Sequence, residues 1–298
     1  MLSAILVIVW IVLIFLAVLP TLYLFVRILR KPGYRLDDTR RWVDYTKAGL
    51  GLWLAAQVIQ IVLFIVIVAG GANTFDVNFD SVGRRVVESI GVVSRTFGTW
   101  AQVCVCLAFF YLSHALTRLR NSGQEDSSKY RKGRVWAWIG AALVAGLTLL
   151  SFALWLSVSV TGGSRSRSER EYRSNRRLVA SCFDIACFAI LIIFAIANIV
   201  YSAKSRKKAL GSPVHKAANI LVTCTSLWFV RMIWSIASAF IGGFHVVFTF
   251  LDIFVSIWLG LAILYMMCRL ASKESYALSK ASYGSVGVGK TGDAEQAL

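Results

Sequence analysis

The sequence is poor in proline and in acidic residues. The first shortage limits the folds that the chain can adopt, and the second limits the partners that it can bind. Three prolines in 298 residues leave long segments free of the residue that most often breaks a helix. Only 15 Asp and Glu stand against 32 Lys and Arg, which gives a net charge of +17. Outside the apolar segments, no basic stretch alternates with the aromatic residues on which nucleic-acid bases stack. We therefore expect no nucleic-acid partner, despite the excess of positive charge.

The cysteines and histidines also lack the spacing of a disulfide framework or a metal site. All six cysteines lie inside apolar segments or at their ends, whereas the cysteines of a disulfide-rich extracellular domain are spread through its loops. The three histidines lie far apart, and no group of His, Cys and Asp has the spacing of metal ligands. We expect neither a metal nor another cofactor.

What the sequence does have is long apolar segments. Its mean hydropathy is +0.67, and 57% of its residues are hydrophobic. This fraction is above the 45–50% that is typical of soluble domains. Segments of about 20 residues are long enough to cross the ~30 Å hydrocarbon core of a bilayer. The predicted fold is therefore all-α, a polytopic membrane protein with a bundle of seven largely unbroken transmembrane helices. The predicted helices span residues 2–26, 48–70, 90–116, 135–160, 178–201, 217–241 and 244–268.

The basic residues predict the orientation of these helices. Of the 32 Lys and Arg, 22 fall in segments 27–47, 117–134 and 202–216 and after residue 268, and eight fall on the other side. Because cytoplasmic loops carry the excess of Lys and Arg, we expect the N-terminus outside and the C-terminus in the cytoplasm. Segment 161–177 runs against this rule, and we interpret it either as a flexible solvated loop or as an outward-facing patch for anionic ligands.

Two further expectations follow from this orientation. The basic loops would face the anionic lipids of the inner leaflet, in the plasma membrane or an endomembrane. Residues 272–298 are rich in Ser, Gly, Ala and Lys, so we expect a disordered cytoplasmic tail.

One motif in this tail formally matches a phosphate-binding loop. Gly284 is followed after four residues by Gly289, Lys290 and Thr291. The chemistry of such a loop needs a strand before it and a helix after it, whose backbone N–H groups hold the phosphates. Neither is predicted here, so we interpret the match as chance. No catalytic residue is assigned, and we do not expect an enzyme.

Charged residues inside the apolar segments are more informative. Arg231 lies in segment 217–241, and an arginine at the centre of a membrane helix costs about 2.5–3.5 kcal/mol even on insertion scales. Such a residue usually faces the bundle and has a partner. Three other charges, Arg95, Asp184 and Asp252, lie in other apolar segments. From their depths, all four belong to the outer half of the bundle. The last two segments are adjacent, so we expect the pair Arg231–Asp252, and for Arg95 a pair with Asp184 or with Glu88.

Polar and aromatic residues extend this group by helical spacing. They predict either ion pairs that fix the packing of the helices, or an outward-opening polar cavity for a small polar or zwitterionic ligand. The candidates for ligand binding or intramembrane ion pairing are Arg231, Asp252, Asp184, Arg95, Gln57, Gln102, Trp228, Trp234 and His245.

Motifs of several seven-helix families are missing. The segment ending near residue 116 has no Asp-Arg-Tyr and the last segment has no Asn-Pro-x-x-Tyr, as rhodopsin-like G-protein-coupled receptors have, and residues 244–268 contain no lysine for retinal. The segment around Arg231 instead shows Val-Arg-x-x-aromatic-Ser-x-x-Ser-x-Phe, formed by Val230, Arg231, Trp234, Ser235, Ser238 and Phe240. In this motif, in length and in hydropathy the chain resembles fungal seven-transmembrane integral membrane proteins of unknown function. That resemblance implies the fold but no activity.

The function that we expect is receptor-like or sensory, with a charge-paired polar site in the outer half and a small ligand or a cytoplasmic partner. The first alternative is a small-solute or proton-coupled transporter. Transporters typically show internal repeats and interrupted helices, and the sequence shows neither. A further alternative is a structural or scaffold protein whose basic loops bind lipid.

Overall fold

The fold is a bundle of long helices. A computed structural model describes residues 2–35, 37–69, 81–120, 127–160, 167–241, 251–273, 276 and 278–280. In this part of the chain every regular element is helical. Seven segments are long and apolar enough to cross a membrane, as the sequence predicts. The elements are α1 (Leu2–Leu29), the 3₁₀ turn η1 (Asp38–Arg40), α2 (Arg41–Ala69), α3 (Ser81–Arg120), α4 (Ser127–Val160), α5 (Arg167–Lys208), α6 (His215–Ile241), the π-helical segment η2 (Ile253–Trp258) and α8 (Leu259–Ser272).

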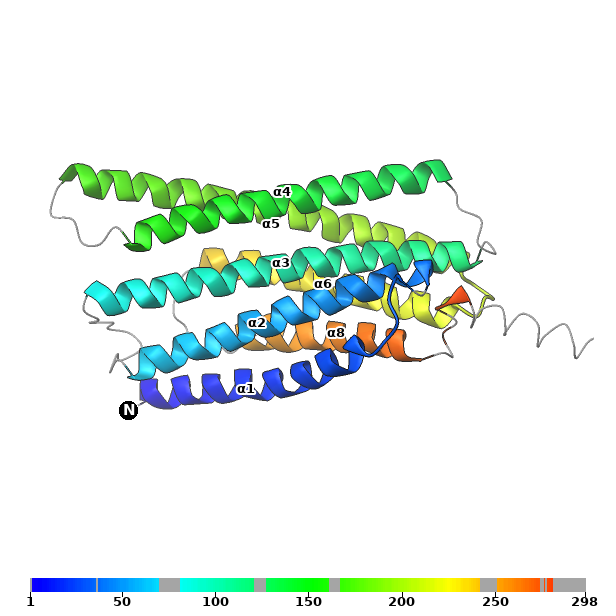
Figure 1. Cartoon of the computed structure of the whole chain (residues 1–298), viewed down its shortest axis with the longest axis horizontal. Helices are drawn as coiled ribbons and strands as arrows, with labels where there is room; N and C mark the ends of the chain where they lie inside the picture. Colours follow the sequence, from blue (N-terminus) through cyan, green and yellow to red (C-terminus); the bar gives the residue numbers. More distant parts are fainter. Residues whose placement is uncertain are drawn as a thin grey trace, which may run out of the picture.

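Helix α3 is the centre of the bundle. In its most apolar stretch 78% of the residues are buried, against 22–50% in the other spans. It packs against α2, α4, α5 and α6. Figure 1 shows α4 and α5 on one side of α3, and α1, α2 and α8 on the other. Side chains on α3 are therefore enclosed by neighbouring helices along most of its length.

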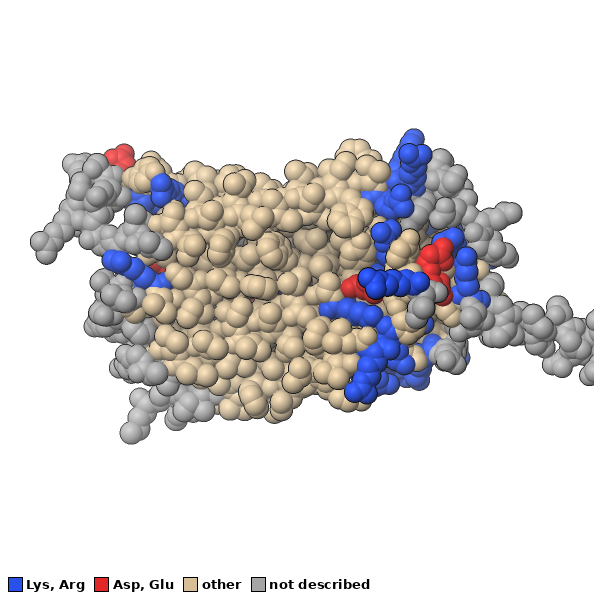
Figure 2. Space-filling view, in the orientation of Figure 1, with Lys and Arg blue, Asp and Glu red and all other residues tan. Residues whose placement is uncertain are grey.

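The outer surface of the bundle is apolar. Phe15 on α1, Leu143 on α4 and Ile193 on α5 are 51%, 53% and 64% exposed. A soluble protein rarely exposes so continuous an apolar surface. Figure 2 shows an uncharged band around the middle of the molecule, with Lys and Arg at the two ends. These features are compatible with a multi-pass membrane protein.

One end carries far more positive charge than the other (Figure 2). We call it the basic end: α1, α3, α5 and α8 end there, and α2, α4 and α6 begin there. This asymmetry is the one that underlies the predicted orientation. The exposed basic residues described at this end are Arg27, Arg30, Arg35, Arg131, Lys132, Arg134, Lys204, Arg206, Lys207, Lys208, Lys216, Arg269, Lys273 and Lys280.

The basic end is closed by the η1 turn. Arg40 Nη2 donates to the carbonyl of Ala271 at 2.7 Å, which joins the turn to the end of α8. Asp38 forms an ion pair with Arg118 of α3 at 2.5 Å. Tyr276 and Leu278, at the start of the predicted tail, are buried. The chain just after α8 therefore packs on the bundle, whereas residues 281–298 lie outside the described residues.

The predicted loop over residues 161–177 is wrong from Arg167 onward. There α5 has already begun. Two arginines tie this first part of α5 to the end of α4: Arg173 Nη2 donates to the carbonyl of Val158 at 3.0 Å, and Arg176 Nη1 to Ser157 Oγ at 3.1 Å. These contacts, in a stretch without proline, stabilise a helix that continues beyond the apolar segment.

The last span is helical from residue 251 to Ser272 among the described residues, but it is not α-helical throughout. It contains the π-helical turn η2, in which the N–H of Leu259 donates to the carbonyl of Phe254 instead of to that of Val255. The sequence does not predict this change of hydrogen-bond register. Single π turns of this kind are frequent at functional sites.

Candidate functional site

Arg231 is held inside the bundle by three helical segments. Its side chain is only 6% exposed. Nε donates to the backbone carbonyl of Ser256, in η2, at 2.9 Å. Cζ lies 4.6 Å from the ring centroid of Trp53 on α2 and 4.8 Å from that of Trp228 on α6. Cation–π contacts of this kind contribute about 2 kcal/mol when they are desolvated, which offsets part of the cost of burying the charge.

The predicted direct pair between Arg231 and Asp252 is not formed. Of the ion pairs within 4.0 Å between described residues, none joins these two side chains. Asp252 Oδ1 instead accepts from Trp234 Nε1 at 3.0 Å and from Ser256 Oγ at 2.8 Å. Ser256 thus links the two charged residues, because its carbonyl accepts from Arg231 and its hydroxyl donates to Asp252.

Around Arg231 several buried polar atoms have no hydrogen-bond partner. They include Arg231 Nη1 itself and the indole N–H groups of both stacked residues, Trp53 and Trp228. Buried polar atoms are normally satisfied, so these three unpaired N–H groups in contacting side chains indicate a place that a polar molecule fills. We call Trp53, Trp228 and Arg231 the Arg231 cluster. The side-chain carbonyls of the predicted residues Gln57 and Gln102 are also buried and unpaired.

Helical spacing places the two predicted glutamines on faces that border this cluster. Gln102, Cys106 and Phe109 lie four and seven residues apart and so share one face of α3. The ring of Phe109 contacts that of Trp228 at a centroid distance of 6.1 Å, which shows that this face looks toward α6. Gln57 lies four residues from Trp53 on α2 and shares its face. The contacts of Arg231 itself come from α2, α6 and, through Ser256, η2.

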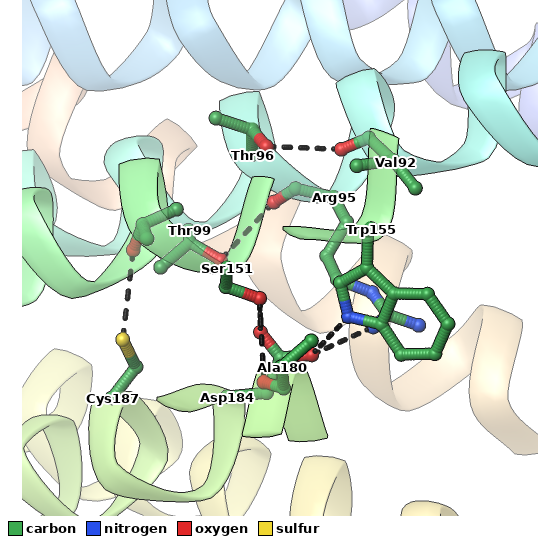
Figure 3. A network of polar contacts seen from close by, with 10 residues as sticks. Val92, Arg95, Thr96, Thr99, Ser151, Trp155, Ala180, Asp184 and Cys187 are labelled. Atoms are coloured by element: carbon green, nitrogen blue, oxygen red, sulfur yellow. Dashed lines mark hydrogen bonds and ion pairs between the residues drawn. The ribbon is translucent and has the colours of Figure 1, made fainter. Parts of the chain in front are cut away.

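The second predicted pair, Arg95–Asp184, is formed. Arg95 Nη1 lies 2.9 Å from Asp184 Oδ2. Asp184 also accepts from Ser151 Oγ at 2.6 Å and from Trp155 Nε1 at 3.2 Å. Figure 3 shows these side chains of α3, α4 and α5 converging on the carboxylate. Its hydrogen bonds come from the protein itself, so this carboxylate has little capacity left for a ligand.

The two arginines also lie at different depths. Arg95 is 23 residues before Arg118, or about 35 Å along α3 from the basic end, and Arg231 is 15 residues after Lys216, or about 22 Å along α6. With a hydrocarbon core of ~30 Å, Arg95 falls at the far border and Arg231 falls inside. The exposed fractions agree with these depths, because Arg95 is 59% exposed and Arg231 only 6%.

Sequence reasoning missed three residues of these sites, namely Trp53, Ser151 and Trp155. A signal was present in each case, since Trp53 lies four residues before Gln57 and Ser151 lies four residues before Trp155. His245 lies outside the described residues. Among the described residues there is no group of three or more His, Cys, Asp and Glu that would hold a metal ion.

Comparisons of the chain with protein-family models, with curated proteins and with solved structures find no match. The resemblance to fungal seven-helix membrane proteins therefore stays an expectation drawn from the motif around Arg231. The function has to be argued from the residues themselves.

Proposed function

We propose that this chain is a receptor-like, sensory membrane protein that binds a small polar ligand at the Arg231 cluster. The observation that carries the proposal is the state of Arg231, which is buried, has no carboxylate within ion-pair distance and keeps Nη1 unpaired. Intramembrane charges are expensive and are functional by default. Asp184 and Asp252, in contrast, are hydrogen-bonded to the protein and support the packing of the helices.

The contacts of Arg231 give a route by which binding acts at a distance. Its Nε holds the carbonyl of Ser256 in η2, and η2 continues into α8. At the other end of α8 the carbonyl of Ala271 is bound by Arg40 of the η1 turn. A ligand that moves the guanidinium therefore acts on a helix that is fastened at the basic end. Receptor function requires such an element, on which both ends of the molecule act.

A screen of small polar compounds tests this proposal. The purified protein in lipid nanodiscs is heated with each compound, and the midpoint of unfolding, Tm, is measured for wild type, Arg231→Gln and Arg95→Gln. We expect at least one compound to raise the Tm of wild type and of Arg95→Gln but not that of Arg231→Gln. The proposal fails if every stabilising compound acts equally on all three proteins, or if none stabilises.

One observation favours transport as a second candidate. The π turn η2 makes the last span irregular directly beside Arg231, and irregular backbone at the substrate site is typical of secondary transporters. Uptake of the stabilising compound into sealed vesicles, driven by a proton or sodium gradient, would identify transport. Binding without uptake would support a receptor.

The proposed orientation places the basic end at the cytoplasmic face, against anionic lipid and a cytoplasmic partner. Glycosylation tags inserted in residues 121–126 and in residues 161–166 test it separately. We expect modification of the tag in 161–166 only. Modification of the tag in 121–126 would reverse the orientation.

A further inference from the structure

The guanidinium of Arg231 has a single polar edge left for a ligand. Two indole rings, from Trp53 and Trp228, lie within 5 Å of Cζ, and Nε is committed to Ser256. Nη1 is buried and unpaired. A ligand therefore meets the edge of the group, where the N–H bonds point, in the geometry by which arginine binds planar oxygen acids.

The free polar atoms around this edge are mostly donors. Besides Arg231 Nη1, the unpaired indole nitrogens of Trp53 and Trp228 donate and never accept. Such a set matches a ligand whose recognised group is an acceptor.

The charges make the same distinction. Arg231 is buried without a carboxylate within ion-pair distance, and a buried charge is costly until it is paired. Asp252 and Asp184 are engaged by Trp234 and Ser256 and by Arg95, Ser151 and Trp155. The cluster therefore contains a buried cation with an unpaired N–H group and no carboxylate of its own, while Asp252 already accepts two hydrogen bonds from neutral donors. It favours an anion over an ammonium group.

On these grounds we infer that the ligand of the Arg231 cluster is a carboxylate, which binds through Nη1 and the indole N–H groups. This inference rests on the proposed function and adds the chemical class of the ligand. The carboxylate belongs either to a small acid that enters from water or to a fatty acid that enters from the bilayer. Both present the same group to Arg231.

Matched sets of compounds test the inference on the intact wild-type protein. The Tm in nanodiscs is measured against the concentration of acetate, hexanoate and palmitate, at constant pH and chloride. Hexanamide and hexylammonium are the controls, because they keep a six-carbon chain and replace the carboxylate with a neutral amide or with a cation. We expect at least one acid to raise the Tm, with the amide and the ammonium ion without effect at equal concentration. Stabilisation by acetate or hexanoate alone identifies a water-soluble acid, and stabilisation by palmitate alone identifies a lipid.

Variants then locate the binding group. Losing a charge-assisted hydrogen bond weakens binding by about tenfold or more, so we expect that loss for Arg231→Gln and none for Arg95→Gln. Trp228→Phe keeps a ring and removes the indole N–H, and we expect about a tenfold loss here too, because this hydrogen bond also goes to the charged carboxylate. This second variant serves if Arg231→Gln fails to fold.

The outcomes distinguish a failure of the carboxylate inference from a failure of the proposed function. If hexanamide or hexylammonium stabilises as well as hexanoate, or if no acid stabilises while another compound acts through Arg231, the carboxylate is wrong and the ligand site stands. If the acids stabilise Arg231→Gln and Trp228→Phe as they do wild type, binding lies elsewhere and the inference is overturned. If no compound of either series acts through Arg231, both the carboxylate and the proposed function fail.

Discussion

Arg95 and Arg231 are both arginines in apolar helices, yet the bundle treats them in opposite ways. Arg95 is largely exposed and lies 2.9 Å from Asp184, which three side chains bind. Arg231 is buried, contacts aromatic rings and a backbone carbonyl, and has no carboxylate within ion-pair distance. The pair that is complete is the more exposed of the two sites, with 59% of the Arg95 side chain open to solvent. The arginine that is left incomplete sits deeper, where solvation is least.

This difference teaches which charged residues to associate with a ligand. A complete ion pair needs no ligand, because it already serves as a contact between helices. Exposed pairs contribute only about 0–1 kcal/mol to the stability of the fold. An incomplete buried cation has a cost that nothing in its surroundings fully offsets. The following substitutions compare the two sites, and the last one extends the comparison to an exposed ion pair at the basic end.

The largest effect is expected at Gly260. A Cβ added at this position would overlap the indole of Trp53, which stacks on Arg231. Gly260→Leu should lower the free energy of unfolding by about 3 kcal/mol, the upper part of the range for overpacked cores. The measurement is SDS-induced unfolding in mixed micelles. Gly146→Leu is the matched control, because no atom lies within 4 Å of its added Cβ. Equal losses in the two variants would show that Gly260 is not a contact of the Arg231 cluster.

The next largest effect separates the two members of the complete pair. Asp184→Ala leaves Ser151 Oγ and Trp155 Nε1 without their acceptor and should cost about 2 kcal/mol. Arg95→Ala leaves Asp184 with both of these donors and should cost less than about 1 kcal/mol. Unfolding of the single and double variants gives the coupling energy. If Arg95→Ala proved the more damaging, the carboxylate would not be the centre of this site.

Two serines permit a closer comparison, because each donates its hydroxyl to a carboxylate. Ser256→Ala removes one of two donors to Asp252, and Ser151→Ala removes one of three donors to Asp184. We expect losses of about 1.5 kcal/mol and about 1 kcal/mol. Thermal unfolding of both variants and of wild type measures the difference, and we expect the lower Tm for Ser256→Ala. A lower Tm for Ser151→Ala would contradict the view that Asp252, with fewer hydrogen-bond donors, depends more on its serine.

The smallest effect is expected at the basic end, where water surrounds the ion pair. Asp38 and Arg118 form a pair whose side chains are 40% and 26% exposed. Asp38→Asn should cost less than about 1 kcal/mol, and the cost should shrink further as salt is added. Unfolding at low and high ionic strength measures both. A loss that salt does not change would mean that the pair is shielded from solvent.

The sequence predicts the spans well, because a bilayer requires about 20 apolar residues of each helix. Helix ends are predicted less well. At Arg173 and Arg176 the hydropathy falls while the helix continues, stabilised by bonds to the end of α4. The π turn leaves no trace in composition, since the segment Ile253–Trp258 reads like any apolar helix.

The candidate site is predicted in part, for a reason of geometry. Depth along a helix follows from residue number, and depth, together with the adjacency of the last two spans, suggested Arg95–Asp184 and Arg231–Asp252. Direction around the helix axis decides contact, and the π turn changes that direction within the last span. Arg231 consequently meets the carbonyl of Ser256, and Asp252 meets Trp234.

The π turn has a consequence for the rotational phase of the last span. One residue of an α-helix corresponds to a rotation of about 100°, so the extra residue in η2 sets the angle between Asp252 on one side and Ala271 on the other. Deleting a single residue of η2 would restore α-helical pairing but would turn one of these contacts away from its partner. The irregular turn therefore allows one helix to meet Trp234 at one level and Arg40 at another, which a regular helix of this length would not do.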